Sequence, residues 1–354
     1  MVSSRFILRL SSLGDVILAS SALEALASSR TLKAEKFDWA TMKGYSELLK
    51  GHPKINQIFE FDRATGLRGW IEFCRNAWNR HYTEILDLHG SLRTRVMRML
   101  FFYWGCRQPQ FKPRWKTVSK QRFRLYGYFI FKNFWSKALR PSPWVERYTQ
   151  LAGGTGKERP NLEHLLRQAK LPSDLLTAFR QQTAPMICVM PGSKWDGKKW
   201  PIENYVELLK NAGYFPVILG HQTDVESKNL CDLLKAAKIP HFSGVGKWNL
   251  AQTACIFTIS NGYLGSDTGL AHLAEAVGVP AQVISGPTTP DMGFAPWRRE
   301  SVSIGKSIGC RPCGKDGRFC FRIANRYACL KDLSAQTVLA KLISSESLNG
   351  QNEL

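Results

Sequence analysis

Short apolar runs alternate with longer amphipathic stretches along the whole chain. Runs that predict buried strands lie at residues 6–10, 36–40, 57–61, 84–88, 186–190, 215–219, 263–265 and 282–285. Helices are predicted between and after them, most clearly at residues 16–26, 202–211, 270–277 and 334–343. Strands that alternate with helices form parallel sheets, so the pattern predicts an α/β fold.

One glycine-rich stretch separates two blocks of this pattern. Residues 152–157 have the sequence AGGTGK, and Arg159-Pro160 follows closely. Such a stretch is typical of a linker between domains. We therefore expect an N-terminal domain over residues 1–165 and a C-terminal domain over residues 184–344. The polar residues 345–354 are expected to form a flexible tail.

The most informative stretch runs from Tyr263 to Thr289. A predicted strand is followed by the turn Asp267-Thr268-Gly269 and a short apolar helix, with Asp267 or Thr268 as its N-cap. Unpaired N–H groups and the helix dipole make such a helix start favourable for an anion, typically phosphate. His272 lies in the first helical turn, where the same dipole favours a neutral imidazole that donates a hydrogen bond. The alternative is an ordinary strand–helix unit with a capped helix, because the stretch has neither a GxGxxG pattern nor a P-loop.

Charged residues also follow two strands of the first half. Asp15 comes after the first strand and after Gly14, a residue that lets the backbone turn sharply or approach a ligand. Its carboxylate suits either a general base or a helix cap. Asp87 and His89 end the fourth strand, where they are candidate cleft residues or ordinary strand-end residues.

Two loops of the second half carry polar groups that suit a nucleotide. The loop after the fifth strand contains glycines with Ser193, Lys194 and Lys198, which would suit contacts to phosphate. It could equally be a polar loop before the next helix, with Pro201 as N1. Asp224 follows the sixth strand and suits either ribose hydroxyls or a helix cap.

The composition adds a strong positive charge. Lys and Arg number 49 against 28 Asp and Glu, which gives a formal net charge of +21. This charge indicates a polyanionic partner: nucleic acid, an anionic membrane surface or a phosphorylated substrate. No Asp or Glu occurs between Leu88 and Val145, where basic residues alternate with aromatic ones. That mixture suits an anionic membrane or a single-stranded nucleic acid, although the sequence contains no recognisable RNP signature, zinc finger or helix-turn-helix.

Leader and cysteine patterns indicate a cytoplasmic protein. The N-terminus turns polar after a short apolar run, so we expect neither a signal peptide nor an anchor, and no apolar run is long enough to span a bilayer. An odd number of cysteines, nine, indicates thiols in a reducing compartment rather than a disulfide framework. Four of them could bind a structural zinc ion, or could be free thiols or an adventitious disulfide: Cys310, Cys313, Cys320 and Cys329.

Three stretches, in this order, resemble one family. Residues 9–17, RLSSLGDVI, resemble the amino-terminal motif of glycosyltransferase family 9, the ADP-heptose:lipopolysaccharide heptosyltransferases. Residues 191–193, PGS, with 198–201, KKWP, resemble its phosphate-loop segment. Residues 265–272, GSDTGLAH, with 286–288, GPT, resemble its donor-binding signature. The resemblance spans most of the chain, while the basic middle, roughly residues 95 to 180, carries no matching motif.

The resemblance implies a GT-B fold, in which two Rossmann-like domains face each other across a cleft. It implies that Lys198 meets the diphosphate of a nucleotide-sugar, with Ser193 and Lys194 nearby. Backbone N–H groups of Thr268 and Gly269 would bind the phosphates, with His272 close by. In the same family pattern Asp267 would hold the hydroxyls of the donor sugar, and Asp224 would meet the ribose.

The resemblance also implies the reaction. Asp15 would be the general base that deprotonates the acceptor hydroxyl, with inversion at the anomeric carbon and without a catalytic metal or other cofactor. The donor would be ADP-heptose and the acceptor a phosphorylated glycolipid, the lipid A-linked inner core of lipopolysaccharide. The enzyme would then be peripheral at the cytoplasmic face of the inner membrane. The residues expected near the acceptor are Ser12, Gly14, Asp87, His89 and Arg93.

Other functions remain open at this point. Some relatives transfer sugars other than heptose, so another nucleotide-sugar donor is the nearest alternative. A basic nucleic-acid-binding protein with a nucleotide-binding fold is the alternative from a different class, although no nucleic-acid partner is expected if the resemblance holds. A sugar epimerase would fit the fold but not the SSLGD motif at residues 11–15.

Overall fold

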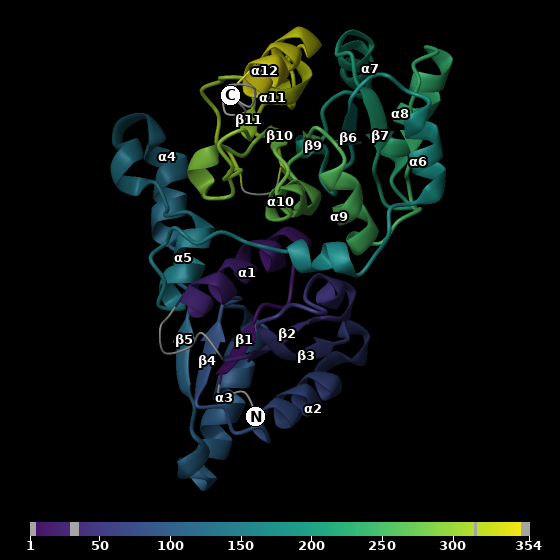
Figure 1. The fold of residues 1–354 in the computed structure, drawn as a ribbon. Coiled ribbons are helices and arrows are strands. Elements are labelled where there is room, and N and C mark those ends of the chain that lie inside the picture. Colours follow the sequence, from purple (N-terminus) through teal and green to yellow (C-terminus); the bar gives the residue numbers. More distant parts are fainter. Residues whose placement is uncertain (1–4, 29–34, 315–316, 348–354) are drawn as a thin grey trace. The chain divides into compact units, whose positions relative to one another are not determined.

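The computed structural model describes residues 5–28, 35–314 and 317–347, and it divides into two compact units (Figure 1). Unit 1 comprises Met1–Arg122 and Ser142–Leu165, and unit 2 comprises Phe123–Pro141 and Leu166–Leu354. The sequence prediction assigned residues 123–141 to the first domain, whereas the structure groups them with unit 2. The chain therefore passes between the units three times rather than once.

Unit 1 is built around a five-stranded parallel sheet with the strand order β3-β2-β1-β4-β5. Its strands are β1 (Arg5–Leu8), β2 (Phe37–Met42), β3 (Ile55–Phe61), β4 (Glu84–Asp87) and β5 (Arg114–Thr117). Its helices are α1 (Leu13–Ser28), α2 (Gly66–Trp78), α3 (Leu92–Arg107) and α5 (Trp144–Leu151). Because parallel strands need crossover connections, α1, α2 and α3 link successive strands, whereas α5 follows the last strand, β5.

Unit 2 contains a six-stranded parallel sheet with the order β11-β10-β9-β6-β7-β8. Its strands are β6 (Met186–Met190), β7 (Phe215–Ile218), β8 (Phe242–Ser243), β9 (Tyr263–Ser266), β10 (Ala281–Ile284) and β11 (Val302–Ile304). Its helices are α4 (Arg122–Leu139), α6 (Ser173–Arg180), α7 (Ile202–Asn211), α8 (Val225–Ala236), α9 (Leu250–Thr258), α10 (Gly269–Ala276), α11 (Ala328–Lys331) and α12 (Ala335–Ser347). Both sheets therefore have the doubly wound order of nucleotide-binding folds.

Each sheet has one place where the strand order reverses. In unit 1 this switch point lies between β1 and β4, which pair in parallel with Leu8 opposite Asp87. In unit 2 it lies between β6 and β9, where Met190 pairs with Gly265. A Cβ atom on Gly265 would lie 2.2 Å from the Met190 carbonyl oxygen, so only glycine fits there. Open α/β sheets bind ligands at the carboxyl ends of the strands beside such a switch point.

The central strands are buried along most of their length. The core of unit 1 includes Phe6, Leu8 and Ile85, and that of unit 2 includes Val189 and Leu264. None of these side chains is exposed to solvent. Removing apolar side chains of this size from water stabilises a fold by about 1.5–3 kcal/mol each. The strands beside each switch point are therefore rigid supports for the loops that follow them.

Most predicted elements are confirmed, with ends that shift by a few residues. β6 and α7 have the predicted bounds. α1 begins at Leu13 rather than at residue 16, so Gly14 and Asp15 lie in its first turn instead of in a loop. Pro201 is the N-cap of α7 and not its N1 residue. α12 extends to Ser347, so the predicted tail from residue 345 is helical at its start, and residues 348–354 lie outside the described residues.

Helix α4 is fixed to the C-terminal part of unit 2 by polar contacts. The Tyr128 hydroxyl donates to Asp291 Oδ2 at 2.8 Å, and Arg140 pairs with Asp291 Oδ1 at 2.8 Å. Lys132 Nζ donates to the carbonyl oxygens of Cys310 and Pro312 at 2.7 and 2.9 Å. These contacts explain why α4 belongs to unit 2. Among the described residues, no helix is both long and apolar enough to cross a membrane.

Candidate functional site

In unit 1, Asp15 lies in the first turn of α1, directly after the central strand β1. Its Oδ1 pairs with Arg9 at 2.7 Å. Its Oδ2 accepts from the Ser12 hydroxyl at 2.9 Å and from the Ser12 N–H at 3.2 Å. The SSLGD motif thus folds back on itself, and the carboxylate satisfies donors of its own turn as a helix-capping residue does.

The Arg9 partner is almost fully buried, with 6% of its surface exposed. It donates to the Leu88 carbonyl oxygen at 2.6 Å, and its guanidinium lies over the Tyr148 ring at 5.6 Å. Burial alone would raise the pKa of Asp15, but the Arg9 charge and the Ser12 hydrogen bonds outweigh burial and lower that pKa below its usual range. Asp15 is therefore ionised at neutral pH.

The other predicted acceptor residues of unit 1 lie at the end of β4 and in α3. The buried Asp87 carboxylate accepts from the N–H groups of His89 and Gly90 at 3.0 and 2.8 Å, so it stabilises the turn that precedes α3. Burial raises the pKa of Asp87 and lowers that of His89 to about 4, with Arg9 and other cations adding to the second effect. Arg93 lies over the Phe61 ring at 5.9 Å.

The structure adds a residue that the sequence did not single out beside Asp15. Lys120 follows β5, and its pKa is lowered by burial and then by the charges of Arg9 and Arg122, while Asp87 and Asp15 act in the opposite direction. Asp15, His89 and Lys120 are thus close enough to affect one another electrostatically. The carboxyl edge of the unit 1 sheet combines the carboxylates of Asp15 and Asp87 with several cations.

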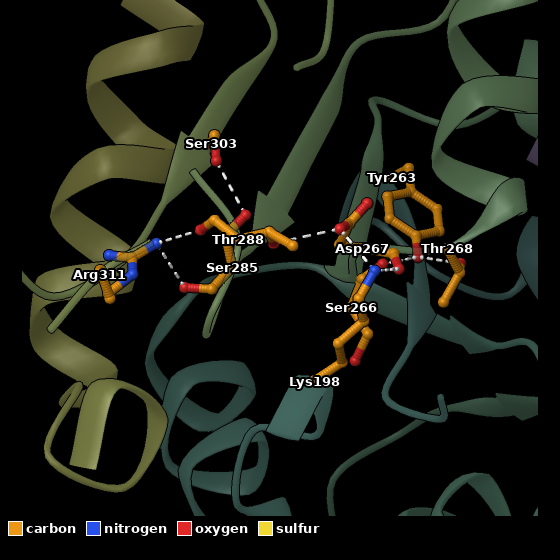
Figure 2. Close-up of polar contacts among 9 residues, drawn as sticks. All are labelled: Lys198, Tyr263, Ser266, Asp267, Thr268, Ser285, Thr288, Ser303 and Arg311. Carbon is orange, nitrogen blue, oxygen red and sulfur yellow. Dashed lines mark hydrogen bonds and ion pairs between the residues drawn. The ribbon is translucent and has the colours of Figure 1, made fainter. Parts of the chain in front are cut away.

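In unit 2, Asp267 directly follows β9, one of the two strands at the switch point, and Figure 2 shows it between two partners. Lys198 Nζ, from the loop after β6, pairs with Asp267 Oδ2 at 2.7 Å and lies 3.3 Å from its backbone oxygen. The buried Thr288 hydroxyl donates to the same Oδ2 at 3.2 Å. Burial alone would raise the pKa of Asp267, but the Lys198 ammonium, His272 and the Thr288 hydroxyl together lower it.

Helix α10 begins directly after this carboxylate. Thr268 is its N-cap residue, but its side chain makes no capping hydrogen bond and instead contacts the Tyr263 hydroxyl at 3.1 Å (Figure 2). The N–H groups of the first turn, which starts at Gly269, are therefore not capped by a side chain and remain suited to an anion. His272 is buried in this turn and stacks on Trp297 with ring centroids 5.7 Å apart.

Trp297 is itself held by α10. Glu275 Oε1 accepts from the N–H groups of Trp297 and Arg298 at 2.7 and 2.9 Å. Burial raises the pKa of Glu275 to about 7, although these N–H donors and the Arg298 charge oppose the rise. One short helix thus positions an imidazole, an indole and a carboxyl group whose pKa is about 7.

The other residues predicted to bind the nucleotide-sugar differ in burial and in their partners. Ser193 is half-buried in the loop after β6, and Lys194 is exposed with its ammonium over the Trp195 ring at 5.1 Å. Asp224 is the N-cap of α8 and accepts from the Ser227 N–H and hydroxyl at 3.4 and 2.8 Å, so its carboxylate caps this helix. A Cβ atom on Gly192 would lie 1.9 Å from Asp224 Oδ2, so this glycine lets the two loops approach closely.

Of the alternatives for the four late cysteines, the structure shows free thiols. Across residues 5–28, 35–314 and 317–347 no group of three or more His, Cys, Asp or Glu side chains is placed to hold a metal ion. Burial raises the pKa of Cys313 and that of Cys329, and neighbouring thiols add to both effects. The four sulfur atoms are thus near one another without the arrangement that a zinc ion requires.

Comparison with known proteins decides between the function classes that the sequence left open. The family model described as Glycosyltransferase family 9 (heptosyltransferase) matches residues 108–319, more than half of the chain. The chain belongs to glycosyltransferase family 9. It is therefore a glycosyltransferase.

Individual relatives agree with this assignment. Lipopolysaccharide heptosyltransferase 1 of Pseudomonas aeruginosa is 26% identical over 322 residues, which cover 87% of this chain and 85% of the relative. Among solved structures, a family 9 glycosyl transferase from Veillonella parvula aligns with a TM-score of 0.71 at 18% identity, over 96% of both chains. The E. coli ADP-heptose heptosyltransferase II structure aligns with a TM-score of 0.68 at 19% identity, over 98% of this chain and 99% of that one. These likenesses show the GT-B fold that the sequence predicted.

Proposed function

We propose that this enzyme transfers heptose from ADP-heptose to the inner core of lipopolysaccharide and inverts the anomeric carbon. The relatives include heptosyltransferases of lipopolysaccharide, and one solved structure of similar fold, E. coli WaaC, contains ADP-2-deoxy-2-fluoro heptose. The observation that carries the proposal is the pairing of Lys198 with Asp267 at the start of α10, at the switch point of unit 2.

Unit 2 supplies the groups that a nucleotide-sugar donor needs. The first turn of α10 offers backbone N–H groups to the diphosphate, and Lys198 offers an ammonium with three N–H donors. The Asp267 carboxylate accepts hydrogen bonds from hydroxyl groups of the sugar. The Thr268 and Gly269 backbone and His272 complete this side, whereas Ser193, Lys194 and Asp224 are assigned supporting contacts to phosphate and ribose.

Unit 1 supplies the base. The acceptor hydroxyl oxygen forms a bond to the anomeric carbon, the bond from that carbon to the diphosphate oxygen breaks, and the hydroxyl proton passes to Asp15. One displacement with one base inverts the configuration. Arg9 keeps Asp15 ionised and therefore ready to accept the proton. Its low pKa makes Asp15 a weak base, so the proton moves late, when the attacking oxygen has become acidic.

The leaving diphosphate is stabilised by positive charge that the chain itself provides. Lys198 and the start of α10 both favour the negative charge that develops on the departing ADP. The proposal therefore assigns no catalytic metal to the reaction. Transfer by the purified enzyme is expected to proceed at an unchanged rate after removal of divalent ions with EDTA, and a rate restored only by Mg²⁺ or Mn²⁺ would contradict this assignment.

We place the acceptor at a membrane surface because the exposed face of α3 is both apolar and basic. The exposed side of this helix carries large apolar residues beside arginines, namely Leu92, Met99, Phe102 and Tyr103 with Arg95, Arg98 and Arg107. No carboxylate lies in this helix. Apolar groups can enter the headgroup layer while arginines meet anionic lipids. We assign this face to the anionic cytoplasmic side of the inner membrane, where a phosphorylated glycolipid would be presented, with Ser12, Gly14, His89 and Lys120 nearest to the acceptor.

The proposal is tested with a donor panel. The purified full-length enzyme is incubated with a heptose-free lipid acceptor and with ADP-heptose, UDP-sugars or GDP-sugars, and the product mass and anomeric configuration are determined. Calorimetry with ADP, UDP and GDP gives the nucleotide preference separately. Transfer from ADP-heptose with inversion is expected, together with preferential binding of ADP. Strong preference for UDP, or retention of configuration, would overturn the proposal.

A further inference from the structure

The Asp267 carboxylate has two oxygen atoms with different surroundings. Lys198 Nζ and the Thr288 hydroxyl both contact Oδ2, at 2.7 and 3.2 Å. Thr288 comes from the loop after β10 and is 5% exposed. Figure 2 shows Thr288 and Lys198 approaching Asp267 from two different segments. Because the contacts from Lys198 and Thr288 both fall on Oδ2, these two residues fix the orientation of the carboxylate.

The loop that carries Thr288 is in turn fixed by Arg311. One guanidinium nitrogen of Arg311 donates to the backbone oxygens of Thr288 and Ser285, at 2.7 and 3.0 Å. The other donates to the Lys306 backbone oxygen at 2.6 Å. Hydrogen bonds from a charged donor are stronger than neutral ones, and a planar guanidinium fixes direction as well as distance. Figure 2 shows this side chain reaching Thr288 from the side opposite Asp267.

Arg311 is itself placed by fixed neighbours. The Cys313 N–H donates to the Pro287 carbonyl oxygen at 3.2 Å, next to Thr288 in the chain. Lys132 of α4 donates to the backbone oxygens on both sides of Arg311, those of Cys310 and Pro312. The segment 310–313 therefore has partners in two other segments, and its arginine has little freedom to leave the loop.

We propose that Arg311 is a positioning residue for donor recognition, which acts through Thr288 on Asp267. It fixes the loop after β10 so that the Thr288 hydroxyl orients the Asp267 carboxylate toward a hydroxyl group of the donor sugar. This inference rests on the proposed function, because it assumes a nucleotide-sugar at the start of α10. Its specific consequence is that Arg311 and Thr288 affect recognition of the sugar and not of the nucleotide.

The first test removes only the hydroxyl, in Thr288→Val. Calorimetry is performed with ADP and with ADP-heptose on the full-length enzyme. We expect ADP-heptose to bind about tenfold more weakly, the typical effect of one lost hydrogen bond to a charged group, and ADP to bind as before. Thr253→Val is the matched control, because Thr253 is also buried in unit 2 and donates to a backbone oxygen, that of Asn249, without contacting Asp267. The proposal would be overturned if Thr288→Val weakened the binding of ADP and ADP-heptose equally, or changed the binding of neither.

The second test asks whether Arg311 acts through Thr288. Arg311→Lys keeps the charge but cannot reproduce the fork of N–H donors, so it is expected to weaken ADP-heptose several-fold while ADP affinity stays constant. Combined with Thr288→Val, it should add less than twofold, because two residues that act through one contact are not additive. If the two substitutions weakened ADP-heptose binding independently, so that their fold-changes multiplied, Arg311 would not act through Thr288. Arg299→Ala, at an exposed position of the same unit, is the control for lost charge.

Thermal unfolding of each variant separates positioning from folding. A lower Tm with unchanged ligand affinities would mean that Arg311 only stabilises the fold, and would contradict the proposal. Failure of the proposed function has a different signature: the unaltered enzyme would bind neither ADP nor ADP-heptose, or would bind them with equal affinity. The two failures are therefore distinguished by measurements on the unaltered enzyme alone.

Discussion

Two carboxylates lie beside the switch points of the two sheets and have different kinds of partner. Asp15 and Asp267 each follow a central strand beside a switch point, and each pairs with a cation at 2.7 Å. In both cases burial would raise the pKa and the paired cation lowers it. Asp15 has contacts on both oxygens, whereas the contacts to Asp267 from Lys198 and Thr288 share one oxygen.

The difference lies in the cations. Arg9 is buried, contacts the Leu88 backbone oxygen and stays charged in any protein, so Asp15 has a fixed partner. Lys198 has a flexible stem and an ammonium that can turn its three protons between Asp267 and a phosphate. A carboxylate paired with a buried arginine is thus kept ionised in one orientation, as a base requires. A carboxylate paired with a lysine can share its cation with a phosphate ligand.

The largest effect is expected for Asp15→Asn. An amide cannot accept the proton, so the transfer rate should fall by about 10²–10⁴-fold, the range of general base catalysis. ADP-heptose affinity should change less than twofold, because Asp15 has no assigned role in donor binding. Glu72→Gln, at an exposed site of α2, is the control. A transfer rate within threefold of the unaltered enzyme would remove Asp15 as the base.

The next largest effect is expected for Lys198→Ala. Loss of the cation beside the leaving diphosphate should lower the transfer rate by about 10²–10³-fold, as for one removed donor at a developing charge. Donor affinity should fall as well, unlike in the Asp15 variant. Lys228→Ala, at an exposed site of α8, serves as control. Steady-state kinetics that show a raised KM with an unchanged kcat would assign Lys198 to ground-state binding only.

Glu275 provides a third carboxyl group that sharpens the comparison, because backbone N–H groups replace the side-chain cation of the other two. Its folded pKa of about 7 lies above the ordinary 4.5, so between these values the folded protein binds a proton that the unfolded chain releases. The free energy of unfolding should therefore fall as pH rises from 4.5 to 7, by up to about 3 kcal/mol.

Glu275→Gln should abolish this dependence, which urea unfolding at several pH values would measure. The two ion-paired carboxylates predict the opposite sign in another window. Because the folded pKa values of Asp15 and Asp267 are lowered, their contribution is present above pH 3.8 and is lost as pH falls below it. An unaltered slope between pH 4.5 and 7 in the Gln variant would contradict the role given to Glu275.

The smallest effect is expected at the α3 face. Phe102→Ser removes a side chain that is 60% exposed, so binding to vesicles that contain anionic lipid should weaken about three- to tenfold, with transfer to a soluble acceptor unchanged. Leu67→Ser, at a residue 69% exposed on α2 of the same unit, is the matched control. Flotation assays would measure both, and equal loss in the two variants would remove α3 as the docking face.

The sequence predicted the elements and the charged residues beside the strands, because strand periodicity, turn residues and helix starts are local signals. It also predicted a phosphate-binding helix start at Asp267, and α10 begins where expected. It could not choose between Asp267 and Thr268 as N-cap, since that choice depends on Lys198 and Tyr263, which lie elsewhere in the sequence.

Contacts between distant residues could not be predicted in this way. Arg9 was part of a recognised motif, but only the parallel pairing of β1 with β4 places it beside Leu88 as well as Asp15. Helix α4 was assigned to the wrong unit, because its aromatic and basic composition does not reveal that Tyr128 and Lys132 have partners about 160 to 180 residues later. The alternatives for the four late cysteines stayed open, because cysteine spacing fixes neither the direction of a thiol nor its distance from the others.

The most direct test of this division of roles is the affinity of ADP-heptose for Asp15→Asn and Asp267→Asn, measured side by side by calorimetry. The account predicts an unchanged dissociation constant for the Asp15 variant and one at least about tenfold higher for the Asp267 variant, which has lost a charged acceptor. Equal weakening in the two variants, or weakening in the Asp15 variant alone, would contradict the assignment of donor binding to unit 2 and of the base to unit 1.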